Sequence, residues 1–322
     1  MITEKVSLFD QIFEAKKRLE TVVIHTPLVP SNILSERKRG EIFFKLENLQ
    51  RTGSFKIRGA YNKLTQLKAG EIQRGVIAAS AGNHAQGVAI SAKMLGIQAR
   101  IFMPVTAPLT KIEATRKYGA LVKLIGETFD ATKQAAIDES FRTGEVFIPP
   151  YDDYQVIAGQ GTIGLEILEE MPNVDQLILP IGGGGLIAGV AVAAKTINPQ
   201  IKIIGVQSYN VHGMLRSIWN HQITANRSER TLADGCDVAI PGELTYEVLE
   251  SLIDETVLVE ESDIKKAIEY LAYKEKIISE GAGALTTAAM MSGALDHLLV
   301  HKKTVALVSG GNIDSGSLKE II

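Results

Sequence analysis

Short apolar runs alternate with amphipathic stretches along most of the chain. The runs are rich in β-branched residues, as strands are, and the stretches between them carry apolar residues at helical spacing. Because several runs are almost wholly apolar, we expect mainly parallel sheets that helices cover on both faces, an α/β fold. The predicted helices include Ala85–Leu95, Lys111–Tyr118 and Ile264–Tyr273. The predicted strands are Glu41–Leu46, Gly75–Ala79, Ala99–Met103, Leu121–Ile125, Val146–Ile148, Leu177–Ile181, Ile201–Val206, Thr256–Val259 and Thr304–Val308.

Two polar junctions divide this pattern. The chain has 322 residues, a length typical of two domains. Asn48–Gly53 is polar, and Pro149-Pro150 is followed by the polar stretch Tyr151–Tyr154. We therefore expect a small domain at 49–148 and a large domain at 1–48 and 149–322, each with a twisted sheet flanked by helices. In such folds ligands bind at the carboxyl ends of strands, so we expect a site between the domains.

Composition excludes several classes of protein. Hydrophobic residues make up 45% of the chain and charged residues 22%, which is enough for a sizeable core and argues against disorder. The net charge of −3, without a long run of like charge, does not favour nucleic-acid or membrane-surface binding. The single cysteine, Cys236, excludes internal disulfides and a cysteine-cluster zinc site. Pro180 and four glycines interrupt the uncharged run 176–194, and the charged start lacks a signal-peptide core, so we expect a cytoplasmic protein.

The remaining pairs of histidines and acids do not form a recognisable metal motif. His297 and His301 have the spacing of two zinc ligands, but no glutamate follows His297 as it does in metalloproteases. Asp152-Asp153 and Asp234–Asp237 have no other metal-ligating residues near them and are predicted to be turns or caps. The chain also lacks a P-loop and a G-x-S-x-G elbow. We expect no bound metal.

A lysine stands at a predicted helix start in Gly53–Gly59. Ser54 is a plausible helix N-cap, which puts Lys56 in the first turn. A cation there opposes the helix dipole, so the position is poor for a structural lysine. It suits a lysine that must lose its proton and attack a carbonyl group. By itself the motif favours a solvated surface lysine at a helix start, since lysines are mostly exposed.

Two small-residue loops follow predicted strands. Ser80–Gly87 opens a helix after the strand that ends at Ala79, and backbone N–H groups at such a helix start bind carboxylates or phosphates. Asn83 and His84 in this loop are candidates for further contacts to a ligand. The stretch Val308–Asn312 is a second glycine turn with hydroxyl and amide side chains. Ordinary loops remain an alternative for both.

Four consecutive glycines, Gly182–Gly185, follow another buried strand. Such a run is costly in backbone entropy, and close approach of a bulky anion such as phosphate would explain it. Gly183, Gly185 and Ala188 also match the dinucleotide pattern G-x-G-x-x-G/A. That pattern needs an acid at the end of the next strand, where this chain has Gln207. A nicotinamide or flavin site is therefore not favoured.

Taken together and in this order, the motifs resemble a known family. Ser54–Ala60, Ser80–His84, the glycine run and Ser309–Asn312 resemble the pyridoxal-phosphate-dependent serine/threonine dehydratases, which have the tryptophan-synthase β fold. Lys45–Thr52 and Pro149–Asp153 match the family as well, so the resemblance covers essentially the whole chain. The short catabolic threonine dehydratases are the most similar branch. The resemblance implies a cytoplasmic homodimer or homotetramer that deaminates L-threonine to 2-oxobutanoate, with L-serine as a secondary substrate.

The resemblance also assigns roles to residues. Lys56 is implied to attach to the pyridoxal phosphate and to remove the Cα proton, the glycine run to hold the phosphate, and Ser309 to contact the pyridine nitrogen. A neutral hydroxyl at that nitrogen makes the ring a weaker electron sink, which suits elimination better than transamination. The implied cofactor-binding residues are Lys56, Phe55, Asn83, Gly182, Gly183, Gly184, Gly185, Leu186 and Ser309. The implied substrate-binding residues are Ser80, Ala81, Gly82, Asn83 and His84.

Two alternatives to a dehydratase remain. A serine racemase resembles the chain over the same motifs, but Ala81 stands where the racemase has its second base, a serine, and Gln207 stands where it has a metal-binding acid. A non-catalytic nucleotide-binding sensor would explain the glycine runs but not Lys56 in its motif. Catabolic family members bind an activator, AMP. By resemblance Arg51, Thr52, Gln86 and Asn312 are possible AMP-binding positions, although Lys117 stands where a relative has an acid. The last motif lies ten residues before Ile322, so we expect no C-terminal regulatory domain.

Overall fold

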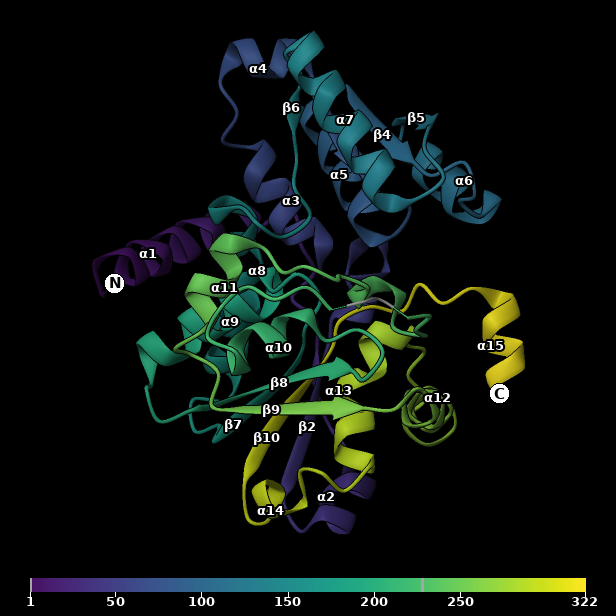
Figure 1. Ribbon diagram of the computed structural model, residues 1–322. Helices are drawn as coiled ribbons and strands as arrows, with labels where there is room; N and C mark the ends of the chain where they lie inside the picture. Colours follow the sequence, from purple (N-terminus) through teal and green to yellow (C-terminus); the bar gives the residue numbers. More distant parts are fainter. Residues whose placement is uncertain (1, 227–228) are drawn as a thin grey trace.

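Two separate sheets organise the chain (Figure 1). This computed structural model describes residues 2–226 and 229–322. The strands are β1 (Leu28–Pro30), β2 (Glu41–Leu46), β3 (Val76–Ala79), β4 (Ala99–Met103), β5 (Leu121–Leu124), β6 (Val146–Phe147), β7 (Gln176–Pro180), β8 (Lys202–Ser208), β9 (Glu255–Val259) and β10 (Lys303–Val308). The larger sheet has the order β1-β2-β10-β7-β8-β9, and the smaller has the order β5-β4-β3-β6. Neighbouring strands are parallel except for β1, which runs antiparallel to β2.

Helices surround both sheets and connect their strands. They are α1 (Ile2–Leu19), α2 (Asn32–Lys38), α3 (Lys56–Leu64), α4 (Ala69–Arg74), α5 (Asn83–Leu95), α6 (Leu109–Lys117), α7 (Phe129–Thr143), α8 (Tyr154–Glu170), α9 (Gly185–Ile197), α10 (Gly213–Trp219), α11 (Glu243–Leu249), α12 (Glu261–Tyr270), α13 (Gly281–Met291), α14 (Asp296–Leu299) and α15 (Ser315–Ile321). Short helical turns are η1 (Glu47–Leu49), η2 (Arg51–Gly53), η3 (Asp234–Cys236) and the π-turn η4 (Leu271–Glu275).

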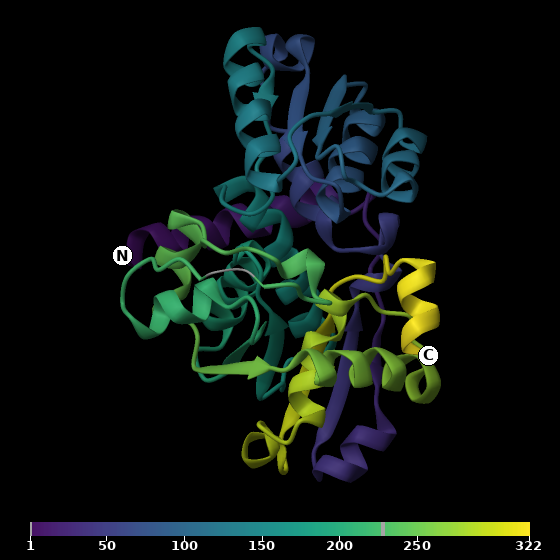
Figure 2. The same ribbon diagram turned by 45° about the vertical axis from the view of Figure 1, so that its right-hand side comes forward.

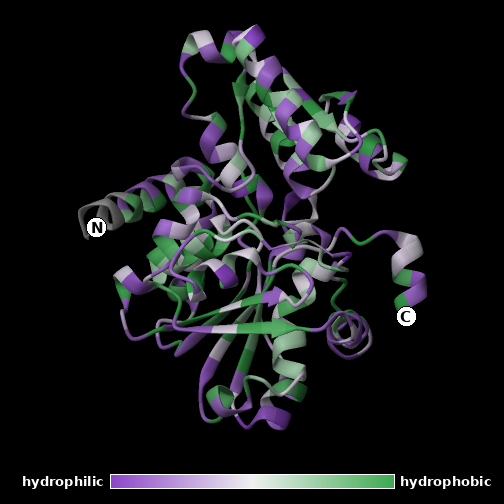
Figure 3. Cartoon of the chain, viewed as in Figure 1, coloured by the Kyte–Doolittle hydropathy of each residue, from purple (hydrophilic) through white to green (hydrophobic). Residues whose placement is uncertain are grey.

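The larger sheet is buried on both faces, as its apolar strands predict. Leu177 and Leu179 of β7 join a core that includes residues of α1, α8 and α9. Ile178, between them in sequence, joins the core that includes α12 and α13 on the opposite face. Successive strand residues point to opposite faces, so a strand buried on both sides needs apolar residues at every position. In Figure 3 the residues of α13 are mostly hydrophobic, whereas α12, which packs outside it, is mostly hydrophilic.

The smaller sheet repeats this arrangement and forms a second body above the first (Figure 2). Val76 and Ala78 of β3 pack with residues of α3 and α5, whereas Ile77 packs with α7 on the other face. We call the elements from α4 to β6 the small lobe, and the larger sheet with its helices the large lobe. The α/β fold class is confirmed. The expected domain boundaries, 48/49 and 148/149, stay a prediction.

The predicted strands all occur, with ends shifted by at most two residues. Strand β1 was missed because it is only three residues long, ends in proline and lies at the sheet edge. The helix predicted at Ile264–Tyr273 is α12 followed by the π-turn η4. Among residues 2–226 and 229–322, no helix combines the length and the apolar character needed to cross a membrane.

Candidate active site

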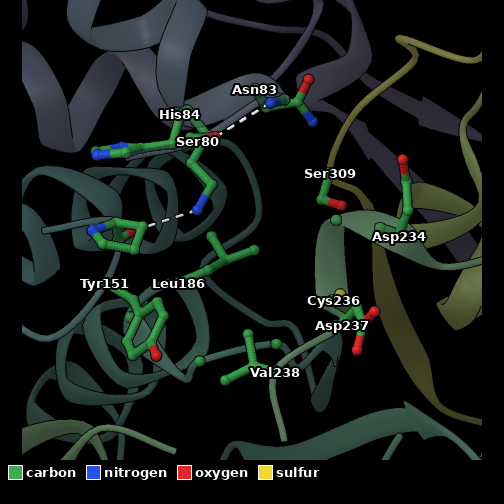
Figure 4. A pocket seen from close by; sticks show the side chains of 18 of the residues that line it. Ser80, Asn83, His84, Tyr151, Leu186, Asp234, Cys236, Asp237, Val238 and Ser309 are labelled. Atoms are coloured by element: carbon green, nitrogen blue, oxygen red, sulfur yellow. Dashed lines mark hydrogen bonds between the residues drawn. The ribbon is translucent and has the colours of Figure 1, made fainter. Parts of the chain in front are cut away.

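A cavity of about 330 Å³ lies where the strand ends of the two sheets meet (Figure 4). The loops that follow β3, β7 and β10 form its walls. Parallel strands present their carboxyl ends at one edge of a sheet, which brings together loops far apart in the sequence. All residues predicted to contact cofactor or substrate line this cavity, namely Phe55, Lys56, Ser80, Ala81, Gly82, Asn83, His84, Gly182, Gly183, Gly184, Gly185, Leu186 and Ser309.

Lys56 is the first residue of α3, as predicted, but Ser54 is not its cap. The N-cap is Phe55, and the buried hydroxyl of Ser54 has no hydrogen-bond partner in the part of the chain that the structure describes. Ser54 instead pairs as an isolated β-bridge with Gly310, and the N–H of Phe55 donates to the carbonyl of Ser309 at 3.2 Å. Ser54 therefore lies one residue before the N-cap, and its backbone is paired with the loop after β10.

The Lys56 amine lies inside the cavity wall. Its Nζ donates to the carbonyl of Pro150 at 3.2 Å and lies 5.1 Å from the centroid of the Phe55 ring. Burial lowers the pKa of Lys56 to about 8, against the opposing influence of Cys236 and Glu280. About a tenth of this amine is therefore neutral at pH 7, far more than for an exposed lysine, and the neutral form is the one that acts as a nucleophile or a base.

The glycine run packs too closely for side chains. Gly184 caps α9 with a φ of +96°, and a Cβ there would lie 2.6 Å from Cε of Met214. A Cβ on Gly183 would lie 2.3 Å from the ring of Tyr151. The first N–H groups of α9 have no partner within their helix, and they lie beside a cavity that also holds Lys56. This cradle of backbone donors fits the phosphate of pyridoxal phosphate, and the nearby amine fits its aldehyde.

The side chain of Asn83 is held from two sides. Its Nδ2 donates to Oε1 of Glu280 at 2.7 Å, and its Oδ1 accepts from Nδ2 of Asn312 at 2.8 Å. Burial and the nearby Asp234 raise the pKa of Glu280 to about 7. One N–H of Asn83 is left for a ligand, because an amide nitrogen carries two donors.

His84 plays a different part from the other residues of its loop. Its Nε2 lies 2.9 Å from the carbonyl oxygen of Ile148, and the side chain is 4% exposed. Burial, reinforced by the Lys56 cation, lowers the pKa of His84 to about 3. The ring is therefore neutral and ties the start of α5 to the segment after β6. Ser80 accepts a hydrogen bond of 3.1 Å from the N–H of Gly82, which shapes the turn before α5.

The positions predicted for an activator are only partly brought together. Nδ2 of Asn312 also donates to the carbonyl of Thr52 at 2.6 Å, and Gln86 lines the cavity with Asn312. The side chain of Arg51 lies elsewhere, because its Nε donates to the carbonyl of Val22 at 2.6 Å.

Sequence reasoning missed several residues that line the cavity, among them Tyr151, Cys236, Asp234, Lys111 and Glu280. Tyr151 stands in a segment recognised only as a connector, and Asp234 in an acidic pair interpreted as a turn. Asp234 does begin the turn η3, and it also pairs with Lys111 across the cavity at 2.8 Å. Nothing in the sequence around Lys111 or Glu280 singles them out, since their place depends on how the lobes meet.

Comparison with known proteins assigns the class. Residues 19–310 match the family model described as pyridoxal-phosphate dependent enzyme, and the chain belongs to this family. The predicted family, fold and cofactor are confirmed, and the family is one of enzymes, which leaves no place for the non-catalytic sensor.

Three individual proteins show which activities occur among the relatives of this chain. The chain is 54% identical over 312 residues to the L-threonine dehydratase catabolic TdcB of Escherichia coli (strain K12), covering 97% of this chain and 95% of the relative. The processed form of threonine deaminase isoform 2 from Solanum lycopersicum superimposes with a TM-score of 0.95 at 39% identity, over 99% of this chain and 87% of that one. Maize serine racemase superimposes with a TM-score of 0.93 at 35% identity, over 97% and 95%.

Proposed function

We propose that this chain is a threonine dehydratase. It deaminates L-threonine to 2-oxobutanoate and ammonia by loss of the β-hydroxyl, and it converts L-serine to pyruvate as a secondary reaction. The observation that carries the proposal is the part-buried amine of Lys56 in one cavity with the glycine run and the Ser80–Asn83 loop. The 54% identity to a catabolic threonine dehydratase supports the choice of substrate.

The residues that hold the cofactor follow from the lining of the cavity. The backbone of Gly182–Gly185 and the N–H group of Leu186 would hold the phosphate, Ser309 would face the pyridine nitrogen, and Asn83 would offer its remaining N–H to the ring. Phe55 packs beside the Lys56 amine. When bound, pyridoxal phosphate supplies the electron sink that stabilises negative charge at Cα of the amino acid.

Lys56 moves the proton of the reaction. Its neutral amine takes the Cα proton of the substrate, and its lowered pKa keeps enough of the neutral form available near pH 7. Among the described residues, Lys56 donates to the backbone carbonyl of Pro150 at 3.2 Å and forms no salt bridge with a carboxylate. No charged partner therefore holds the amine away from the cavity.

The start of α5 binds the substrate carboxylate. Ser80, Ala81, Gly82 and Asn83 line the cavity, and the first N–H groups of α5 have no partner within the helix. A carboxylate at this end faces the positive end of the helix dipole. His84 contributes indirectly, since its ring holds the start of α5 in place.

The main alternative reaction is serine racemization, because the chain is also similar to maize serine racemase. A racemase needs a second base on the opposite face of the substrate. Ala81 lines the cavity where a serine would supply that base, and its methyl group cannot exchange a proton. We therefore propose elimination over racemization.

Release of keto acid from threonine and from serine, measured side by side on the purified protein with pyridoxal phosphate, tests the proposal. We expect 2-oxobutanoate to form faster than pyruvate. Chiral analysis of serine after long incubation serves as the second readout, and abundant D-serine without keto acid would assign a racemase instead.

Four further properties belong to the same proposal. The small domain comprises residues 49–148, the protein acts in the cytoplasm, it assembles as a homodimer or homotetramer, and AMP activates it. Thr52, Gln86 and Asn312 lie near the cavity and support an effector site, whereas the hydrogen bond of Arg51 to Val22 does not. Light scattering measures the assembly, and titration of AMP at low threonine measures the activation.

A further inference from the structure

Four charged side chains are buried together beside α3, outside the cavity. Arg58, Lys45 and Glu47 have no exposed surface, and Glu166 is 6% exposed. Lys45 Nζ lies 2.8 Å from Oε2 of Glu166, and its other contacts include the carbonyl of Thr26 at 2.6 Å. Burial alone would raise the pKa of Glu166, but the cations of Arg58 and Lys45 outweigh burial and lower it. Two buried cations therefore face two buried carboxylates, and Lys45 also lies 3.3 Å from the more exposed Glu170.

The guanidinium of Arg58 uses all of its N–H donors. Nε and Nη2 donate to the two carboxylate oxygens of Glu47, both at 2.8 Å. Nη1 and Nη2 donate to the two oxygens of Glu166, at 2.5 and 3.0 Å. The remaining N–H on Nη1 donates to Oγ1 of Thr162 at 3.1 Å. A guanidinium is a rigid planar fork with five donors, so these acceptors fix both its position and its orientation.

These bonds join α3 to two parts of the large lobe. Glu47 directly follows β2, and Glu166 lies on α8. The backbones of α3 and α8 are also in direct contact, because a Cβ on Gly159 would lie 2.4 Å from the carbonyl oxygen of Arg58. Oε1 of Gln160 accepts from the N–H of Gly59 at 3.1 Å. Helix α3 cannot slide or rotate on α8 without breaking these contacts.

The same helix carries the cavity lysine. Lys56 lies two residues before Arg58, which on an α-helix separates their directions by roughly 200°. Lys56 accordingly faces the cavity while Arg58 faces the buried charges. Because a hydrogen-bonded helical turn is stiff, whatever fixes the rotation of Arg58 about the helix axis also fixes where the Lys56 amine lies.

Stability by itself does not account for this cluster. Removing four charges from water is costly, and apolar residues of similar volume are often as stable or more so in such places. What apolar residues lack is the directional fit of a bidentate guanidinium. We propose that Arg58 is a positioning residue: its forked bonds to Glu47 and Glu166 set the rotation of α3 that points the Lys56 amine into the cavity. The proposal rests on the proposed function only in taking Lys56 as the residue that attaches to the cofactor.

The substitution Arg58→Lys tests this role, because lysine keeps the charge and loses the fork. The first readout is the rate at which added pyridoxal phosphate attaches to Lys56 of the cofactor-free protein, followed by borohydride reduction and peptide mass mapping. The second is kcat and KM for threonine. A misplaced amine predicts attachment and kcat lower by about 10- to 100-fold, with a much smaller change in KM.

Arg100→Lys is the matched control. Arg100 on β4 of the small lobe donates through Nε to Glu145 and through Nη1 to Glu139, both at 2.8 Å, and it does not line the cavity. We expect this variant to unfold at a lower temperature while its attachment rate and kcat stay at the wild-type values. If Arg58→Lys also loses only thermal stability, the positioning role is wrong and the cluster is structural.

Glu47→Gln provides a milder test in case Arg58→Lys does not fold. It keeps the side-chain volume and replaces one of the two carboxylate oxygens that accept from Nε and Nη2 of Arg58 with an amide donor. Slower attachment at Lys56 in this variant supports the proposal, and an unchanged rate overturns it. If the wild-type chain attaches the cofactor at Lys56 but releases no keto acid from threonine, the proposed function fails while the attachment rates still decide the role of Arg58.

Discussion

The side-chain amide of Asn83 donates a hydrogen bond of 2.7 Å to the buried carboxyl of Glu280. Asn83 begins α5, beside the small sheet, whereas Glu280 is the N-cap of α13 in the large lobe, so the bond spans the two lobes. Asn312 donates to the other end of the same amide. The orientation of Asn83 in the cavity therefore depends on both lobes being in place.

Glu280→Gln is expected to lower the pKa of Lys56. The negative charge of Glu280 raises this pKa against the larger lowering by burial, so its removal shifts the pKa below about 8. The neutral amine is the reactive form, so the rate of cofactor attachment rises with pH through this pKa and levels off above it. The midpoint of that pH profile should lie near 8 in the wild-type protein and lower in Glu280→Gln. Glu145→Gln, in the small lobe beside Arg100, should keep the wild-type midpoint.

Lys56→Ala is expected to abolish covalent attachment of the cofactor and to reduce keto-acid release by about 10²- to 10⁴-fold or more, since both nucleophile and base are lost. Lys63→Ala is the control, because Lys63 lies on the same helix and pairs with Asp153 at 2.7 Å without lining the cavity. Normal turnover by Lys56→Ala would contradict the proposed mechanism.

Gly184→Ala is expected to weaken cofactor binding and to destabilise the protein by about 1–3 kcal/mol, since its positive φ and the contact with Met214 both oppose a side chain. Equilibrium titration with pyridoxal phosphate and thermal unfolding measure the two effects. Gly70→Ala is the matched control: it lies on the exposed helix α4, its nearest atom is 3.6 Å from the added Cβ, and a gain of about 0.4–1 kcal/mol is expected. Similar behaviour of the two variants would show that the run does not need glycine at 184.

His84→Gln is expected to make the stability less dependent on pH in mild acid. Burial lowers the pKa of His84 from 6.5 to about 3, so the unfolded chain binds a proton between these values and the folded chain does not. The stability from neutral His84 is present above pH 6.5 and is lost as the pH falls toward 3, by up to about 1.4 kcal/mol per pH unit. Denaturant unfolding from pH 7 to pH 4 measures the slope. His297→Gln, at an exposed position, should keep the wild-type slope.

The elements and the chemistry of the strand ends were predictable from the sequence. The apolar runs located β2 through β10 because a strand buried on both faces leaves a pattern that involves only adjacent residues. The run Gly182–Gly185 and the motif around Lys56 were recognisable for a similar reason. The glycine run requires close approach of another group to the backbone, and the Lys56 motif requires a lysine at a helix start. Each requirement involves only a few adjacent residues, so the sequence reveals it.

Contacts between the lobes were decided only by the tertiary structure. Ser54 looked like a cap, but the loop at Gly310 pairs with it across more than 250 residues of sequence. His84 lines the cavity as predicted, but the bond between its ring and the carbonyl of Ile148 depends on a segment more than 60 residues away. Glu280 and Arg58 gain their partners from helices and strands that meet only in the folded chain. A residue's neighbours along the chain determine which local structure it forms, whereas the charge, hydrogen bonds and reactivity of a buried group depend on neighbours that the sequence order does not reveal.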